Sequence, residues 1–249
     1  MRRLILALGL LVAGPALAAG GTIALPQQNW SFGGLFGTFD RASAQRGFQV
    51  YKEVCAACHA AKQLSYRNLS ELGLTEDEVK AIAAGYQVKD GPNDNGEMFE
   101  RPGRPSDRFV RPYPNEQAAR AAQNGAYPPD LSLIVKARAD GANYLHALLT
   151  GYADPPAGMT MGTGMNFNKY FPGNQIAMVA PLADDRVTYS DGTKATLDQM
   201  SRDVTTFLAW AAEPELETRR AMGVRMILFL LILTVLAYAV KRKIWADLH

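Results

Sequence analysis

Two cysteines and a histidine stand together in the segment Cys55-Ala56-Ala57-Cys58-His59, and the chain has no other cysteines. A C-x-x-C-H pattern is typical of covalent haem attachment. Two thiols three residues apart on a helical turn can reach the two vinyl groups on one edge of a porphyrin, and the adjacent imidazole then comes under the iron. The motif therefore predicts one covalently bound haem c, with Cys55 and Cys58 as thioether donors and His59 as an iron ligand.

Other sites also use closely spaced cysteines. A redox dithiol is expected beside a βαβ pattern, which this sequence lacks. Half of a zinc site needs a second pair of cysteines or histidines, and the remaining histidines are His146 and His249. A structural disulfide would leave His59 without a role, and an exported domain that depends on crosslinks normally carries several cysteine pairs. Haem attachment is the interpretation that uses all three residues.

Spacing alone does not select a second axial ligand for the iron. His249 lies beyond the C-terminal apolar segment, and His146 lies in the apolar run YLHALLTGY, where a packed helix histidine is the commoner case. The methionines between the two apolar ends offer a thioether instead. On the residues alone, those in the Gly-rich segment 154–174 are the most attractive, because a flexible loop can bring them to the iron. The candidates are Met98, Met159, Met161, Met165, Met178 and Met200.

The N-terminus has the three parts of an export leader. Met1-Arg2-Arg3 is positively charged, Leu4–Ala13 is an apolar run of ten residues, and Pro15–Ala18 offers small residues for a signal peptidase. Ten residues are too few to span a hydrocarbon core of ~30 Å. We therefore expect residues 1–18 to be a signal peptide.

The C-terminus has the features of a membrane anchor. Residues 221–240 form a twenty-residue apolar stretch whose only charge is Arg225, and this is the length that a membrane-spanning helix needs. Lys241–Lys243 is a basic cluster that the positive-inside rule places in the cytoplasm. The leader supports the same orientation. Residues 19–212 are thus predicted to be a periplasmic domain, and residues 213–249 an anchor with a short cytoplasmic tail.

The charge balance argues against nucleic-acid binding. The whole chain has a net charge of +2, but Arg2 and Arg3 lie in the leader, and residues 213–249 contain six basic and four acidic residues. The exported part is therefore slightly acidic, and it has no basic stripe. Acidic residues at 76–78 and 94–100 could steer a basic protein partner, or could form an ordinary solvated surface.

Apolar periodicity and capping residues predict a mainly helical domain with long loops. Thr75 is a candidate N-cap before Glu76-Asp77-Glu78. Val187–Leu197, with Asp191-Gly192 in its middle, is typical of a small β-hairpin. Gly- and Pro-rich sequence predicts loops over 88–114 and 154–174. Helices are expected over 40–54, 71–84, 115–124, 131–138, 143–149 and 197–212.

Four stretches of the chain resemble the cytochrome c1 family of the respiratory bc1 complex. They are RGFQVYKEVCAACH, then RPYPNEQAARAAQNGAYPPDLSLIVKARADGANYLHALLTGY, then FNKYFPGNQIAM, and finally DVTTFLAWAAEPE before the anchor. The C-x-x-C-H motif alone indicates only a c-type haem, whereas the other three stretches are specific to this family. The resemblance implies a mainly α fold: a class I cytochrome c-like haem domain with long loop insertions and a small β-hairpin, plus one C-terminal transmembrane helix.

The resemblance also implies roles for individual residues. Met178, which closes the FPG-x-x-I-x-M segment, would be the second axial ligand of the haem iron, paired with His59. Arg138 would pair with a haem propionate, and Tyr144 would donate a hydrogen bond to one. The backbone carbonyl of Pro128 or Pro129 would accept the Nδ1–H of His59.

The resemblance further implies a function. The chain would transfer one electron at a time from the Rieske iron–sulfur protein to a c-type cytochrome, within a dimeric quinol–cytochrome c oxidoreductase that also contains cytochrome b. It would lie in the bacterial inner membrane, crossing it once, and would perform no bond chemistry on its own. Two alternatives are an independent membrane-anchored electron carrier, and a haem sensor or peroxidase with an open iron site.

Overall fold

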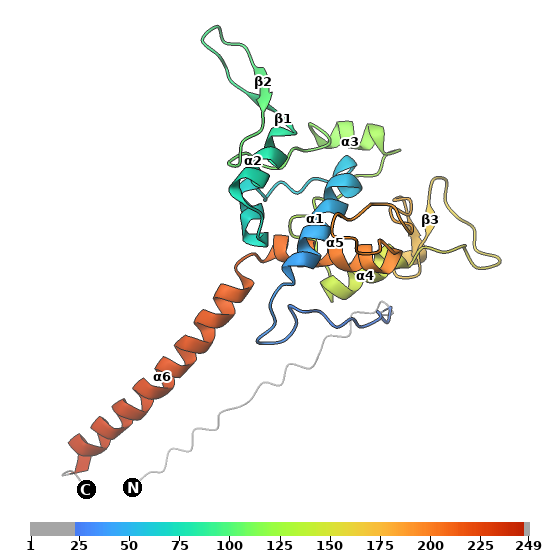
Figure 1. The fold of residues 1–249 in the computed structure, drawn as a ribbon. Helices are drawn as coiled ribbons and strands as arrows, with labels where there is room; N and C mark the ends of the chain where they lie inside the picture. Colours follow the sequence, from blue (N-terminus) through green and yellow to red (C-terminus); the bar gives the residue numbers. More distant parts are fainter. Residues whose placement is uncertain (1–22, 247–249) are drawn as a thin grey trace, which may run out of the picture.

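A computed structural model describes residues 23–246 of the chain. The predicted signal peptide, residues 1–18, lies outside the described residues. Figure 1 shows a body of short helices and loops from which one long helix, α6 (Leu216–Trp245), projects. The body is mainly helical, as predicted, and it also has two small antiparallel strand pairs. Its helices are α1 (Arg41–Glu53), α2 (Glu76–Ala84), α3 (Glu116–Ala122), α4 (Gly141–Thr150) and α5 (Leu197–Ala212), with the 3-10 turns η1 (Cys55–Ala57), η2 (Tyr66–Leu72) and η3 (Pro172–Asn174).

Helices α1 and α5 begin within one residue of their predicted starts, whereas α2 begins at Glu76, after the predicted N-cap Thr75 and five residues later than the predicted range 71–84. Each of the three starts has an N-cap side chain. The Asp40 carboxylate accepts the Ser43 N–H at 3.1 Å, and the Thr196 hydroxyl accepts the Gln199 N–H at 3.1 Å. Thr75 and Glu78 bond each other's backbone N–H groups, which forms a capping box. These bonds satisfy backbone donors that a helix start leaves without partners.

The core lies where α1 crosses α5. Gly47 permits the close approach, because a Cβ at this position would lie 1.9 Å from the backbone oxygen of Asp203. Phe48 then packs on Phe207, with ring centroids 5.6 Å apart, and Phe207 packs on Trp210 at 5.7 Å. These rings are buried, and burying large aromatic side chains contributes much of the stability of a small core.

A buried ion pair joins the same two helices. Asp203 is fully buried on α5, and its carboxylate accepts from the Arg46 Nε at 2.9 Å and from the Ser43 hydroxyl at 2.7 Å, both on α1. Arg46 also reaches Asp191 at 2.9 Å. A buried carboxylate is tolerated only with such partners, so the network fixes how the two helices are positioned along each other.

The β-hairpin is in a different place from the predicted one. Residues 187–196 are irregular with one turn at 190–191, because Val187 and Tyr189 are buried in the body instead of pairing with a second strand, and Leu197 begins α5. The hairpin lies in a segment predicted to be a loop, where β1 (Gln87–Asp90) pairs with β2 (Phe99–Pro102). It extends from the body on the side away from α6 (Figure 1). A second pair joins β3 (Asn166–Phe167) to β4 (Gln175–Ile176).

The prediction of a helix over residues 131–138 is also wrong. Residues 131–140 form consecutive turns, and α4 starts only at Gly141. Gly141 is required at this start, because a Cβ there would lie 1.7 Å from the carbonyl oxygen of Val135. The chain therefore folds back on itself before α4 instead of continuing a helix.

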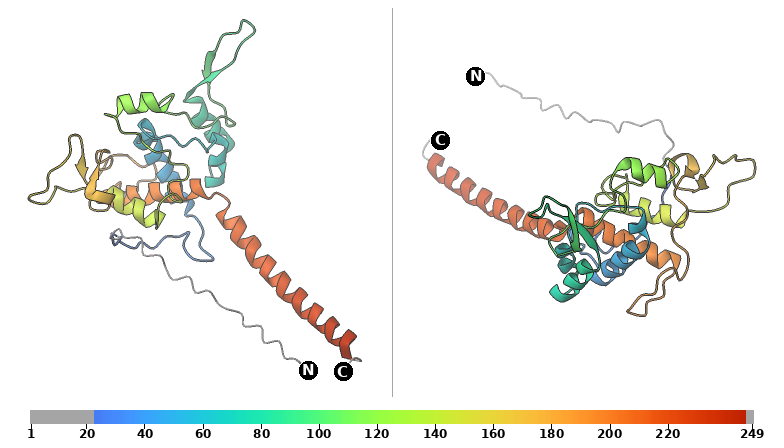
Figure 2. Two further views of the ribbon diagram at one scale, coloured as in Figure 1. Left: turned by 180° about the vertical axis from the view of Figure 1, so that it is seen from behind. Right: turned by 90° about the horizontal axis from the view of Figure 1, so that it is seen from above.

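Helix α6 (Leu216–Trp245) extends the predicted span at both ends. It is long and apolar enough to cross a membrane, with a mean hydropathy of 2.3 over a window that is not buried in the structure. All views show it clear of the body beyond its first turns (Figures 1 and 2). α5 ends at Ala212, so only residues 213–215 separate the core helix from α6.

The crossing at Gly47 gives the first testable prediction. Gly47→Ala should lower the free energy of unfolding of the haem-bearing protein by about 2–3 kcal/mol, because the new methyl group meets backbone atoms that cannot move aside. Denaturant unfolding followed by far-ultraviolet circular dichroism measures this change.

The matched control is Gly223→Ala. A Cβ at Gly223 meets no atom within 4 Å, so this variant should stay within about 0.5 kcal/mol of the parent. Equal stability of the two variants would show that the helices do not cross at Gly47.

Candidate haem site

The C-x-x-C-H motif forms a tight turn directly after α1. Val54 caps α1, and η1 covers Cys55–Ala57. The backbone N–H groups of Cys58 and His59 both donate to the carbonyl of Cys55, at 3.1 and 2.9 Å. Both thiols are free and half-buried. The two thiols and the imidazole are therefore held within one turn of backbone, which fits the donor set of covalent haem attachment.

The thiol of Cys55 does not resemble that of a redox dithiol. Burial raises the pKa of the Cys55 thiol to about 12, and the neighbouring Cys58 adds to the rise. Reactive cysteines in exchange enzymes instead have a lowered pKa, because the thiolate is the nucleophile. The environment of Cys55 thus argues against thiol exchange by this motif.

His59 has one ring nitrogen in use and one available. Its Nδ1 lies 2.8 Å from the backbone oxygen of Pro129, so Nδ1 carries the proton and donates it to that carbonyl. Burial lowers the pKa of His59, which favours the neutral ring. Within residues 23–246, no group bonds Nε2. A neutral imidazole with its Nε2 lone pair available has the protonation state of a metal ligand, and the bond at Nδ1 fixes its orientation.

Asp130 holds the carbonyl of Pro129 in place. Its carboxylate accepts the backbone N–H of Lys62 at 3.0 Å and that of Ser132 at 3.0 Å. The backbone N–H of Leu131 donates to Ala60 at 2.8 Å. These bonds join residues 130–132, directly after Pro129, to residues 60–62, directly after His59. No motif in the sequence marks Asp130 for this role.

Arg138 and Tyr144 lie together, as a shared anion site requires. Burial raises the pKa of the Tyr144 hydroxyl, and the nearby positive charge of Arg138 acts in the opposite direction. Arg138 is exposed and donates to the carbonyl of Ala137 at 2.9 Å, and it has no acidic partner within residues 23–246. A guanidinium beside a phenol hydroxyl can bind a carboxylate, such as a haem propionate.

Met178 follows β4 in a segment attached to two other elements. Its backbone oxygen accepts the Tyr152 hydroxyl at 3.1 Å and the Asn166 side-chain amide at 3.4 Å. Its side chain is half-buried, next to the buried Ile176. Within the described residues, no hydrogen bond joins this segment to the C-x-x-C-H turn, so ligation of iron by Met178 stays a prediction. Tyr152 and Asn166, which hold Met178, were not predicted from the sequence.

The other candidate ligands differ in their surroundings. Met200 is fully buried in the core on α5, and Met98 is 64% exposed at the β1–β2 hairpin. The segment with Met159, Met161 and Met165 projects from the body beside β3 (Figure 1). His146 is buried on α4, where its Nε2 lies 2.9 Å from the carboxylate of Asp198. That bond gives the Nε2 of His146 a partner other than a metal, whereas its buried Nδ1 has no hydrogen-bond partner within residues 23–246.

Comparisons with known proteins identify relatives of the whole chain. A model described as the cytochrome C1 family matches residues 30–248. Cytochrome c1 of Rhodospirillum rubrum is 46% identical over 265 residues, covering 99% of this chain and 97% of that protein. A mitochondrial cytochrome c1 heme protein of Arabidopsis thaliana is 54% identical over 224 residues, covering 90% and 73%. Cytochrome b/c1 of Bradyrhizobium diazoefficiens is 50% identical over 246 residues, but this chain spans only 36% of that protein.

The two hydrogen bonds that the Asp130 carboxylate accepts give the second testable prediction. Asp130→Ala should lower the free energy of unfolding by about 2 kcal/mol, because two backbone N–H groups lose a charged acceptor. Asp130→Asn should lose less, since its amide oxygen can still accept one bond. Urea unfolding followed by the haem absorbance provides the measurement.

Asp154→Ala is the control, because Asp154 is exposed and makes no hydrogen bond within residues 23–246. It should unfold at the same urea concentration as the parent protein. If Asp130→Ala also left the free energy of unfolding unchanged, the carboxylate would not be the group that holds the Pro129 segment in place.

Proposed function

The chain belongs to the cytochrome c1 family, and from this premise we propose that it passes single electrons from the Rieske iron–sulfur protein to a c-type cytochrome. As a member of this family it is a haem subunit of the bc1 complex, acts in electron transport and carries a covalently bound haem c. The observation that carries the proposal is the state of His59. Its Nδ1–H is bonded to Pro129, which leaves Nε2 as a ligand beside two attachment thiols.

When bound, the haem supplies a one-electron couple at its iron. Cys55 and Cys58 would hold it through thioether bonds, and His59 Nε2 and the Met178 sulfur would be its iron ligands. A thioether ligand favours ferrous iron, which raises the reduction potential relative to other ligand sets. Together these two residues would exclude other ligands from the iron, as an electron relay requires. The chain would make and break no substrate bonds on its own.

Arg138 and Tyr144 would act at the edge of the site. The guanidinium of Arg138 has no acidic partner within the described residues, so a propionate would compensate its charge. The adjacent Tyr144 hydroxyl would donate a second hydrogen bond to the same group. A propionate held in this way is stabilised as the anion.

The proposed topology has three parts. Residues 1–18 would be a removed leader, residues 19–212 a periplasmic haem domain, and residues 213–249 an anchor in the bacterial inner membrane with a cytoplasmic tail. The end of α5 at Ala212 supports the second boundary. The short connection 213–215 favours a subunit held in a complex over an independent carrier, which would need a flexible linker to reach several partners. The partners would be cytochrome b, the Rieske protein and the acceptor, in a complex with two copies of each subunit.

Acidic residues near the hairpin support a docking role toward a basic acceptor. Glu76 and Asp77 are almost fully exposed on α2, and within the described residues Lys80 is the only cation that pairs with them. Asp94, Glu97 and Glu100 are exposed on the β1–β2 hairpin, which extends away from α6 and hence from the membrane (Figure 1). Glu78 differs, because its carboxylate accepts the Thr75 N–H at 2.7 Å and so caps α2.

The axial ligands are the subject of the third prediction. The protein purified with its anchor should show a far-red methionine–iron charge-transfer band when oxidised and should not bind carbon monoxide when reduced. Met178→Leu should abolish the band and open the iron to carbon monoxide. The measurement is an optical spectrum of each protein in both oxidation states.

Met200→Leu is the control for this experiment, because Met200 is fully buried in the core. It should keep the band. A parent protein that binds carbon monoxide readily would mean that Met178 is not a ligand and would favour the sensor or peroxidase alternative.

The acidic surface is the subject of the fourth prediction. Reversing both Asp94 and Glu97 to lysine should lower the association rate with a basic c-type cytochrome by about tenfold at low salt and flatten its salt dependence, because long-range attraction is lost. Stopped-flow oxidation of the reduced complex at several ionic strengths measures the rate. Asp154→Lys changes charge on another exposed segment and should have little effect. An unchanged salt slope in the double variant would refute the docking role.

A further inference from the structure

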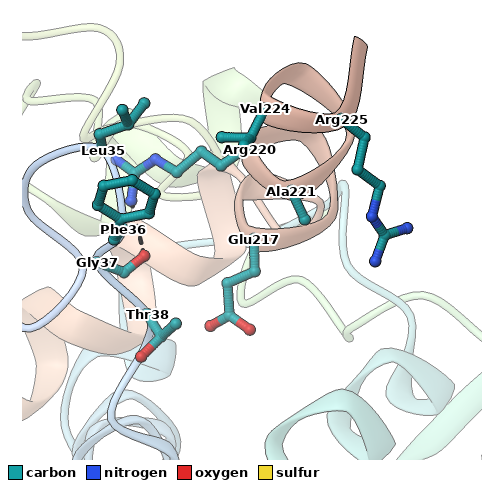
Figure 3. A pocket seen from close by; sticks show the side chains of 9 residues that line it. All are labelled: Leu35, Phe36, Gly37, Thr38, Glu217, Arg220, Ala221, Val224 and Arg225. Atoms are coloured by element: carbon teal, nitrogen blue, oxygen red, sulfur yellow. Dashed lines mark hydrogen bonds between the residues drawn. The ribbon is translucent and has the colours of Figure 1, made fainter. Parts of the chain in front are cut away.

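An N-terminal segment of the described chain is fastened across the start of α6. The Nη1 of Arg220 donates to the backbone oxygens of both Phe32 and Gly37, each at 2.8 Å. The Phe39 N–H donates to the carboxylate of Glu217 at 2.7 Å. Figure 3 shows Arg220 passing behind Leu35 and Phe36 to reach Gly37. The loop tip 35–36 is therefore held beside α6.

The loop tip exposes apolar side chains at this junction. Leu35 is 62% exposed and Phe36 is 80% exposed. With Ala221 and Val224 of α6, they line a pocket of about 340 Å³ (Figure 3). Neighbouring large apolar side chains on a surface usually mark a contact with a partner or a membrane.

The pocket has an excess of positive charge. Arg219 is paired with Glu213 at 2.7 Å, and Glu217 is paired with Arg41 at 2.9 Å. Arg220 bonds only carbonyl oxygens, and Arg225 has no acidic partner within residues 23–246. Both arginines line the pocket together with Glu217, whose charge is compensated by Arg41, so the lining has an excess of positive charge. An anionic group is therefore the complementary ligand.

The position of the pocket along α6 identifies the kind of anion. The apolar stretch 221–240 has twenty residues, which at ~1.5 Å each match a hydrocarbon core of ~30 Å. The edge of the hydrocarbon thus falls near Ala221, where the pocket lies. In Figure 3 the side chain of Arg225 points from its Cα back toward the level of Glu217, which places the guanidinium at the depth of headgroup phosphates.

We propose that this pocket binds one phospholipid of the leaflet on the haem-domain side. Its phosphate accepts hydrogen bonds from the Arg225 guanidinium, and its first acyl methylenes lie against Phe36 and Val224. The volume suits a headgroup with its glycerol, whereas a partner helix would need a longer groove. The inference rests on the membrane anchor and not on electron transfer.

Native mass spectrometry of the full-length, haem-bearing protein in detergent, titrated with phosphatidylglycerol, tests the proposal. Arg225→Gln should weaken binding of one lipid by about threefold to tenfold, because a charged hydrogen bond is removed. Phe36→Ser should also weaken it, because the acyl chain loses its apolar contact. Arg219→Gln is the matched control: this arginine lies on the same helix outside the pocket, and its variant should bind like the parent.

Two further probes separate a lipid from other sources of the same chemistry. Diacylglycerol, which lacks the phosphate, should bind the parent protein and Arg225→Gln equally weakly, and millimolar inorganic phosphate should not displace the lipid. Equal phosphatidylglycerol binding by the parent and Arg225→Gln, or displacement by inorganic phosphate, would overturn the proposal. The haem spectrum of each variant should match that of the parent, so the result does not depend on the electron-transfer role.

Discussion

The crossing of α1 and α5 is the constraint on which the site depends. Cys55 follows α1 after a single capping residue, so a shift of α1 along α5 would move the attachment turn by the same amount. Gly47 allows backbone contact at the crossing, and the buried Asp203 carboxylate, bonded to Arg46 and Ser43, prevents sliding. Close packing and a satisfied buried charge thus position the attachment motif, whose Cys55 and Ala56 pack against the same core.

The parts of the molecule that are determined by residues close together in the sequence could be predicted from the sequence. The helices at 41–53 and 197–212 were predicted to within one residue, because apolar periodicity and an N-cap coincide there. The C-x-x-C-H motif predicted the haem, and the further stretches identified the family, which the comparisons confirm. In these segments, local preference and the packed fold favour the same structure.

The predictions failed where distant contacts decide the structure. The segment 187–197 has strand-forming residues and an Asp-Gly turn, but Tyr189 is buried under Arg46, and Asp191 bonds that arginine. The strands at 87–90 and 99–102 are stabilised partly by Arg101, which bonds Asp90 and, outside the hairpin, Asp107. Asp130 likewise acts on the distant Lys62 backbone. A short stretch of sequence does not reveal bonds to residues far away in the chain. The place of the hairpin and the role of Asp130 are therefore visible only in the folded structure.

The junction between body and anchor has a mechanical consequence. Three connecting residues, the Arg220 bonds to two loop carbonyls and the Glu217 bond to Phe39 leave the body little freedom to tilt or rise on α6. A domain mounted in this way presents its cofactor at a constant height above the bilayer. Electron tunnelling rates depend steeply on distance, so a haem domain held in this way would leave any gating of electron transfer by movement to the proteins that exchange electrons with it.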